Sequence, residues 1–161
     1  MTSRRKFIKH IGLGTAAITL VNNPLFADQD VISKITILHT NDMHSRIEPF
    51  NSGRNKGLGG MAQRSTIIKN LRKENKNVLL LDAGDIFQGT PYFNYYGGEL
   101  EFKLMSEMKY DAATLGNHDF DNGLIGLKRQ LKHAKFPFLI ANYDFKETIL
   151  NGFHGIKAIF Q

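Results

Sequence analysis

The chain has 161 residues, of which 42% are hydrophobic and 22% are charged. This length fits one domain with a real hydrophobic core, and the composition excludes a disordered or fibrous protein. Because cysteine is absent, disulfides, zinc–thiolate sites and thiol nucleophiles are excluded, and a metal could be held only by His, Asp, Glu, Asn or Gln. The net charge of +6 gives no reason to expect a nucleic-acid partner, since residues 28–161 carry 17 basic and 15 acidic side chains.

Residues 1–27 have the three parts of a secretory signal peptide. A basic segment precedes the apolar run 11–21, and cleavage after Ala27 would release the rest of the chain. The apolar run is too short to span a bilayer, which takes about 20 residues, so we expect no stable membrane insertion. The segment 3–9, with Arg4 and Arg5, resembles the twin-arginine signal. That resemblance implies export of the folded protein by the twin-arginine machinery, to the periplasm or beyond the cell surface.

Four apolar segments of strand length follow the signal, and apolar residues at helical spacing separate them. The alternation of strands and helices predicts an α/β fold with a parallel sheet that is covered on both faces. A weaker pattern near the end of the chain suggests a hairpin of residues 148–150 and 155–160 around Asn151-Gly152. The four expected strands are residues 34–39, 77–81, 111–115 and 136–141, and the expected helices lie near 61–71, 100–108 and 124–134.

Polar side chains follow each expected strand, at residues 39–44, 82–85, 116–121 and 142–144. The carboxyl ends of parallel strands lie on one edge of a sheet, where ligands bind. Each fragment alone is typical of a turn, a helix cap or a core histidine. Together they would be costly to bury without a metal or a substrate. The sequence therefore predicts a site at this edge, with Asp42, His44, Asp85, Asn117 and His118 as candidates.

This set of side chains suits two-metal hydrolysis. Oxygen and imidazole ligands without thiolate favour Zn, Mn, Fe or Ca. Asp42 and His44 are spaced to bind one ion, and Asp85 could bridge two ions about 3.5–4 Å apart. Two divalent ions outweigh two carboxylates and one hydroxide, so the centre would stay positive and attract a phosphate.

Three motifs resemble those of the calcineurin-like metallophosphoesterases, and more narrowly the exported bacterial 5′-nucleotidase/UDP-sugar hydrolase branch. They are HTNDMH at residues 39–44, DAGDIFQGT at 82–90 and LGNHDFD at 115–121, and the likeness runs from about residue 34 to 142. The resemblance implies that residues 28–161 are the parallel-sheet half of an α/β sandwich, the N-terminal portion of the domain. It also implies two divalent ions, such as Zn or Mn, and hydrolysis of nucleotide phosphate monoesters through a hydroxide that bridges the metals.

The same resemblance implies a role for each matching residue. Asp42 and His44 would bind the first metal, Asp85 would bridge both metals, and Asn117 would bind the second. His118 would stabilise the transition state or protonate the leaving oxygen, with Asp121 orienting its imidazole. Family members often carry Glu where this chain has Asp119, a position that is not a ligand.

Parts of the family pattern have no counterpart in this chain, namely further metal-binding histidines and the C-terminal domain that holds the nucleobase. We expect His133 and His154 to be exposed to solvent, and residues 28–161 to be the front of an enzyme and inactive alone. A non-catalytic metal-binding remnant, a cyclic-nucleotide phosphodiesterase and a thiosulfohydrolase stay open as alternatives. We interpret the aromatic residues after the second motif as a packing cluster rather than a base-stacking platform; they are Tyr92, Phe93, Tyr95 and Tyr96.

Overall fold

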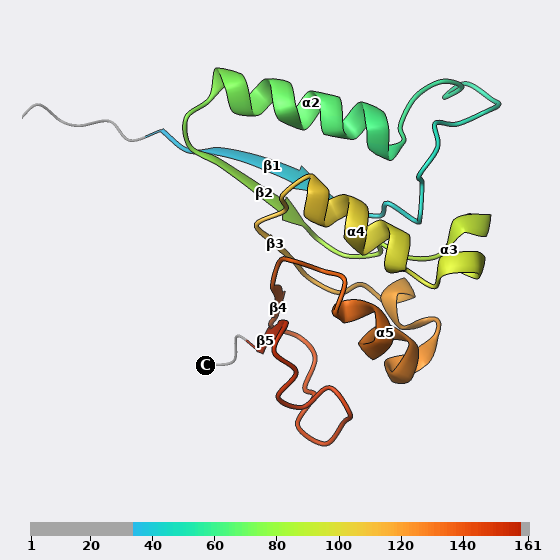
Figure 1. Ribbon diagram of the computed structural model, residues 1–161, viewed down its shortest axis with the longest axis vertical. Coiled ribbons are helices and arrows are strands. Elements are labelled where there is room, and N and C mark those ends of the chain that lie inside the picture. Colours follow the sequence, from blue (N-terminus) through green and yellow to red (C-terminus); the bar gives the residue numbers. More distant parts are fainter. Residues whose placement is uncertain (1–33, 159–161) are drawn as a thin grey trace, which may run out of the picture. The chain divides into compact units, whose positions relative to one another are not determined.

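A single sheet of five parallel strands, in the order β1-β2-β3-β4-β5, organises the fold (Figure 1). The computed structural model describes residues 34–158, so the predicted signal peptide lies outside the described residues. The first four strands coincide with the four expected segments, which confirms the parallel α/β fold. The strands are β1 (Thr36–Thr40), β2 (Val78–Asp82), β3 (Ala112–Ala113), β4 (Phe138–Ile140) and β5 (Ile156–Ala158).

Helices connect the first four strands, as the apolar spacing predicts. The α2 helix buries Met61 and Ile68, and the α4 helix buries Phe102 and Met105. Within the described residues, no helix combines the length and the apolar character that a membrane crossing requires. The helices are α2 (Met61–Glu74), α3 (Pro91–Tyr96), α4 (Glu99–Glu107), the 3-10 helix η2 (His118–Phe120) and α5 (Gly123–Leu131).

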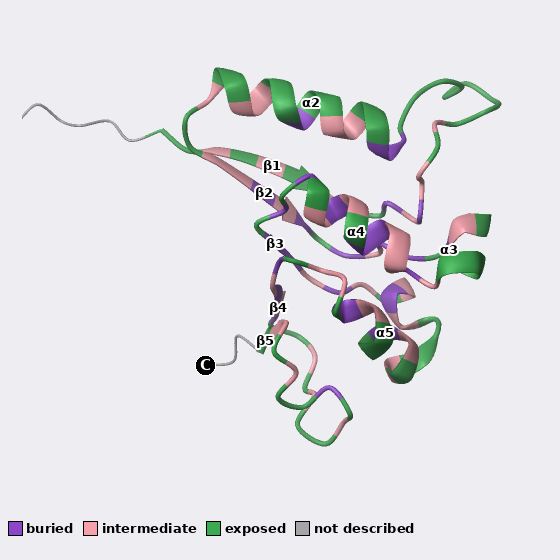
Figure 2. Ribbon diagram, in the orientation of Figure 1, coloured by how far each residue is buried: buried purple, intermediate pink, exposed green. Residues whose placement is uncertain are grey.

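The helices cover one face of the sheet in the described part of the chain. The register pairs Leu38 with Leu80 and Ile37 with Leu79, so the members of each pair point to the same face. Leu80 is 0% exposed, whereas Ile37 on the other face is 60% exposed. In Figure 2, β1 alternates between half-buried and exposed residues, whereas β2 includes buried ones. Strands that follow one another in chain order, with right-handed crossovers, place their helices on the same side. Over residues 34–158 the helices cover one face only, so these residues do not provide the second cover that the alternation predicts. The exposed second face agrees with the expectation that residues 28–161 are one half of an α/β sandwich.

The segment before β5 forms turns and not the first half of a hairpin. The N–H and the hydroxyl of Thr148 both donate to the carbonyl of Phe145, and the N–H of Leu150 donates to the Thr148 hydroxyl. These local bonds occupy the polar groups that a strand would offer to a neighbour. β5 instead pairs in parallel with β4, so the hairpin prediction is wrong.

The aromatic residues of α3 divide into two groups. Phe93 is buried against Phe87, with ring centroids 5.4 Å apart, as a packing cluster predicts. Tyr95 and Tyr96 are 85% and 52% exposed, so the packing interpretation is wrong for these two side chains. A helix of six residues has one inward face, and Phe93 occupies it.

Replacing a side chain by alanine should lower the free energy of unfolding by different amounts on the two faces of the sheet. Leu80→Ala should lower the free energy of unfolding by about 2–5 kcal/mol, because it leaves a cavity under the helices. Ile37→Ala should cost less than about 1.5 kcal/mol, because much of this side chain already meets water. Urea unfolding of both variants measures the difference, and equal losses would contradict a sheet that is covered on one face.

Candidate metal centre

The loops that follow β1 and β2 are joined by backbone hydrogen bonds beyond the ends of the strands. The N–H of Asp42 donates to the carbonyl of Gly84 at 2.9 Å, and the N–H of His44 donates to that of Asp85 at 3.1 Å. The N–H of Ser45 continues the series, donating to Ile86 at 2.9 Å. The parallel pairing of the strands thus extends into the loops and fixes their side chains relative to one another.

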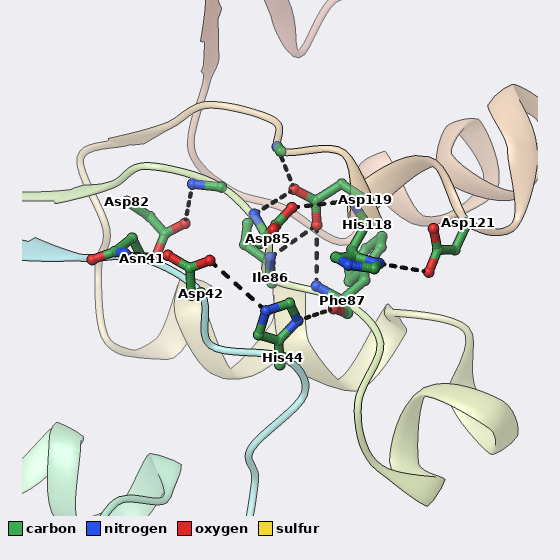
Figure 3. Close-up of polar contacts among 12 residues, drawn as sticks. Asn41, Asp42, His44, Asp82, Asp85, Ile86, Phe87, His118, Asp119 and Asp121 are labelled. Atoms are coloured by element: carbon green, nitrogen blue, oxygen red, sulfur yellow. Dashed lines mark hydrogen bonds and ion pairs between the residues drawn. The ribbon is translucent and has the colours of Figure 1, made fainter.

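Asp42, His44 and Asp85 come together at this edge of the sheet (Figure 3). Each offers one ligand atom, and these atoms all lie within 4.8 Å of one another. His44 Nδ1 lies 3.3 Å from the carbonyl oxygen of Phe87, and its Nε2 lies 3.8 Å from Asp42 Oδ1. If Nδ1 donates its hydrogen to that carbonyl, Nε2 keeps a free lone pair. This atom faces the carboxylate of Asp42, as the ligand atom of a metal-binding histidine does.

The backbone at these three residues is left-handed, with φ of 49° at Asp42, 45° at His44 and 55° at Asp85. A residue other than glycine in this region costs of order 1–3 kcal/mol and persists only where its surroundings hold it. The inter-loop hydrogen bonds do so here. Such residues concentrate at functional sites, so the strain supports a functional interpretation of this edge.

The loop after β3 packs against the loop after β2 through two glycines. A Cβ atom on Gly84 would collide with the backbone of Gly116, and one on Gly116 would collide with the carboxylate of Asp85. Gly84 also has φ of 96°, which favours glycine. These two positions allow the second and third loops to approach closely enough to share the side chain of Asp85.

His118 faces the Asp42–His44–Asp85 group from the third loop. Its N–H donates to Asp85 Oδ1 at 3.0 Å, and its ring centroid lies 5.2 Å from that of His44. Its Nδ1 lies 2.9 Å from Asp121 Oδ2, and this hydrogen bond raises the pKa of His118 above its usual value. Asn117 is exposed and immediately precedes His118 in the chain. The structure thus brings His118 of the third loop to the edge that carries Asp42, His44 and Asp85.

Three polar residues to which the sequence assigned no role in the site support these loops. The Asn41 side-chain amide donates to the carboxylate of Asp42. Asp82 accepts from the Thr40 hydroxyl at 2.6 Å, and Asp119 is 1% exposed. Burial raises the pKa of Asp82 and of Asp119 to about 6, against hydrogen bonds that lower both values. For Asp82 and Asp119, the signal that could have revealed them was an acidic residue within a motif that has no obvious basic partner.

Other candidate residues lie elsewhere. His133 is partly buried, with its Nε2 3.8 Å from Glu99, so the expectation of an exposed His133 is wrong. His154 is exposed, as expected. Asp144, which follows the fourth strand, accepts from the N–H of Lys146 in its own turn. The metal-ligand group in the described part of the chain comes from the first two loops.

The donors of this group fit a divalent cation. Two carboxylates and one imidazole, without sulfur, suit zinc, manganese or iron, and two negative charges close together at a partly exposed edge attract a cation. The exposed fraction of the side chain is 36% for His44 and 57% for Asp42, which leaves the ligand atoms open to solvent. These three side chains could therefore hold a divalent cation, and their exposure leaves room for a further ligand.

Comparison with known proteins agrees with this geometry. The chain is 49% identical over 128 residues to the snake venom 5′-nucleotidase of Crotalus adamanteus, covering 76% of this chain and 22% of that protein. It is 44% identical over 130 residues to the 5′-nucleotidase of Homo sapiens, covering 76% of this chain and 23% of that protein. The chain thus spans less than a quarter of the length of these relatives.

Solved structures give the same picture. The NAD nucleotidase of Haemophilus influenzae superposes with a TM-score of 0.67 at 37% identity, over 73% of this chain and 22% of that one. The 5′-nucleotidase precursor of Thermus thermophilus superposes with a TM-score of 0.66 at 42% identity, over 73% of this chain and 24% of that one. The family model for the calcineurin-like phosphoesterases matches residues 35–159. The chain therefore belongs to the calcineurin-like phosphoesterase family, whose members use divalent metals.

Proposed function

We propose that this chain carries the N-terminal part of a metal-dependent phosphoesterase that hydrolyses nucleotide phosphate monoesters, as a 5′-nucleotidase does. One observation carries the proposal: the Asp42–His44–Asp85 group is faced by a histidine that is bonded to a carboxylate. The names of the relatives, 5′-nucleotidases and an NAD nucleotidase, support a nucleotide as the substrate.

Two divalent ions complete the proposed centre. Asp42 and His44 would hold the first ion, Asp85 would serve both ions, and Asn117 would contribute to the second. Divalent ions in such a site polarise the phosphate and lower the pKa of water. The protein contributes by fixing its carboxylates: Asp85 Oδ1 is held by the N–H of His118, so its orientation is set before any ion binds.

His118 is the proposed general acid. Its imidazole lies beside the ring of His44 and is partly exposed, so a substrate bound at the group could receive its proton. The Nδ1–H bonds to Asp121, so Nε2 carries the proton that can be delivered. Asp121 favours the protonated ring, which is the form a general acid requires.

We also propose export through the twin-arginine machinery, followed by action in the periplasm or outside the cell. The basic segment with Arg4 and Arg5, ahead of a short apolar run, supports this. The venom relatives and the precursor in the name of the Thermus structure are in keeping with an exported protein. Export in the folded state would deliver the hydrolase with its metal loops already assembled.

The bond between His118 and Asp121 can be tested by titration. Asp121→Asn should lower the pKa of His118, because it removes the carboxylate that favours the imidazolium form. The side-chain resonances of His118, followed by NMR against pH in the metal-free chain, measure this change. Asp144→Asn, which removes an exposed carboxylate elsewhere, should leave the titration of His118 as it is in the wild type. An unchanged His118 titration in Asp121→Asn would contradict the proposed pair.

Substitutions of the bridging ligand Asp85 and of the general acid His118 should affect metal content and activity differently. The variants are made in the whole protein that the gene encodes. Asp85→Ala should lose both ions and the activity, because this carboxylate serves both. His118→Asn should keep the ions and lower kcat by about 10²–10⁴, the range for a general acid. Metal analysis of the purified variants, together with AMP hydrolysis, provides both readouts.

The matched control is Asp144→Asn, which should retain metals and activity. Two tightly bound ions in Asp85→Ala would show that the bridging assignment is wrong. A wild-type protein that binds two ions but releases no phosphate from any nucleotide would instead favour the non-catalytic alternative.

Export has its own test. Replacing Arg4 and Arg5 together by Lys should leave the protein in the cytoplasm, because the twin-arginine signal depends on the arginine pair. Cell fractionation and immunoblotting measure the distribution, and Lys6→Arg serves as a charge-matched control. Exported protein at wild-type levels in the double variant would contradict this route.

A further inference from the structure

Asp119 is the most completely bonded carboxylate in the described part of the chain, and no role has been assigned to it. Its Oδ1 accepts from the N–H groups of Ile86 at 2.9 Å and Phe87 at 3.1 Å. Its Oδ2 accepts from those of Asp85 at 3.0 Å and Gly116 at 2.8 Å. All four donors belong to the backbone, and Figure 3 shows them converging on one buried side chain.

This arrangement excludes Asp119 from the ligand set. Each carboxylate oxygen offers about two acceptor sites, and two N–H groups already occupy both sites on each oxygen. A metal could bind Asp119 only if some of these bonds broke and left buried N–H groups unpaired, which costs more than a typical hydrogen bond contributes. The influence of Asp119 on the metal centre must therefore pass through the backbone that it holds.

The backbone in question carries the candidate bridging ligand. Asp85, Ile86 and Phe87 present three successive N–H groups to one anion, a concave arrangement known as a nest. Ile86 and Phe87 are 0% and 1% exposed, so water could not replace the carboxylate as their acceptor. Asp85 is also in the left-handed region, with φ of 55°, and needs such support.

The fourth bond joins this loop to the next one. Gly116 precedes the Asn117-His118 pair, so Asp119 fixes the distance between the loop of Asp85 and the loop of His118. On its other side, the loop of Asp85 accepts hydrogen bonds from the N–H groups of Asp42 and His44. A displacement of residues 84–87 would therefore move the three candidate ligands relative to one another.

We propose that Asp119 is a positioning residue, whose carboxylate fixes residues 85–87 against Gly116 and thereby sets the metal affinity of the Asp42–His44–Asp85 group. The proposal rests on the proposed function only in taking these three residues as the metal ligands. It is independent of the substrate and of the chemistry that follows metal binding.

Asp119→Asn tests the proposal. The amide can still accept from two N–H groups, but its NH₂ faces the other two donors, so two of the four hydrogen bonds are lost. Mn²⁺ titration of the 161-residue chain by calorimetry should show about 10–100-fold weaker binding, the usual cost of removing a group that orients a ligand. Asp119→Glu, which keeps the carboxylate, should restore most of the affinity.

Two controls separate positioning from general stability. Leu127→Ala makes a cavity in the core on α5, where Leu127 is 1% exposed, and should lower Tm without changing the Kd for Mn²⁺. In the metal-free chain, amide hydrogen exchange should accelerate at residues 85–87 and 116 in Asp119→Asn, and not at these sites in Leu127→Ala under matched stability. This exchange does not depend on any activity, or on metal binding.

The outcomes decide the proposal. A Kd in Asp119→Asn equal to that of the wild type, or an equal loss in Leu127→Ala, would overturn it. If Asp119→Asn does not fold, Asp119→Glu decides. A folded Asp119→Glu whose amides at residues 85–87 and 116 are protected, and whose Mn²⁺ affinity is near that of the wild type, supports the proposal. Protected amides without that affinity overturn it, as does the unfolding of both variants. A wild type that binds no Mn²⁺ would also overturn it, whatever the amide exchange shows. Mn²⁺ binding that depends on Asp119, without nucleotide hydrolysis, would reject only the proposed function.

Discussion

The functional edge of this protein depends on the hydrogen bonds that tie residues 84–87 to the loops on both sides. Carbonyl groups of this loop accept from the loop after β1, and its N–H groups donate to Asp119 in the loop after β3. The carboxylate of Asp85 itself accepts from His118. The short central loop is thus bonded through its carbonyls, its amides and a side chain. The relative positions of the three loops follow from this one set of contacts.

The sheet makes these contacts possible. Parallel strands in sequential order bring three carboxyl ends side by side, and the β1–β2 register continues beyond Thr40 and Asp82 into the loops. Gly84 and Gly116 then let two backbones touch where any side chain would separate them. Left-handed residues in the site are tolerated because the bonded loops leave them little freedom. The site therefore combines strained backbone with dense hydrogen bonding, which is a means of holding ligands in place before a cation arrives.

Much of this could be predicted from the sequence, because the information is local. Apolar runs of five or six residues indicated β1 and β2, and motifs at the strand ends indicated Asp42, His44 and Asp85. The errors concern properties that depend on distant parts of the chain. Exposure of Ile37 follows from the strand order, and parallel pairing of β5 with β4 follows from turns that compete with a hairpin. The hydrogen bonds that Asp119 accepts could not be predicted either, because its partners are backbone N–H groups, which every residue except proline carries.

The central claim is that Asp42, His44 and Asp85 form a divalent metal site. Anomalous scattering from a crystal of the chain grown with Mn²⁺ tests it most directly. We predict an anomalous peak at coordination distance from a carboxylate oxygen of Asp42, Nε2 of His44 and a carboxylate oxygen of Asp85, with residues 84–87 in the backbone conformation described above. A Mn²⁺ peak bound elsewhere, with these three side chains turned away from one another, would contradict the account.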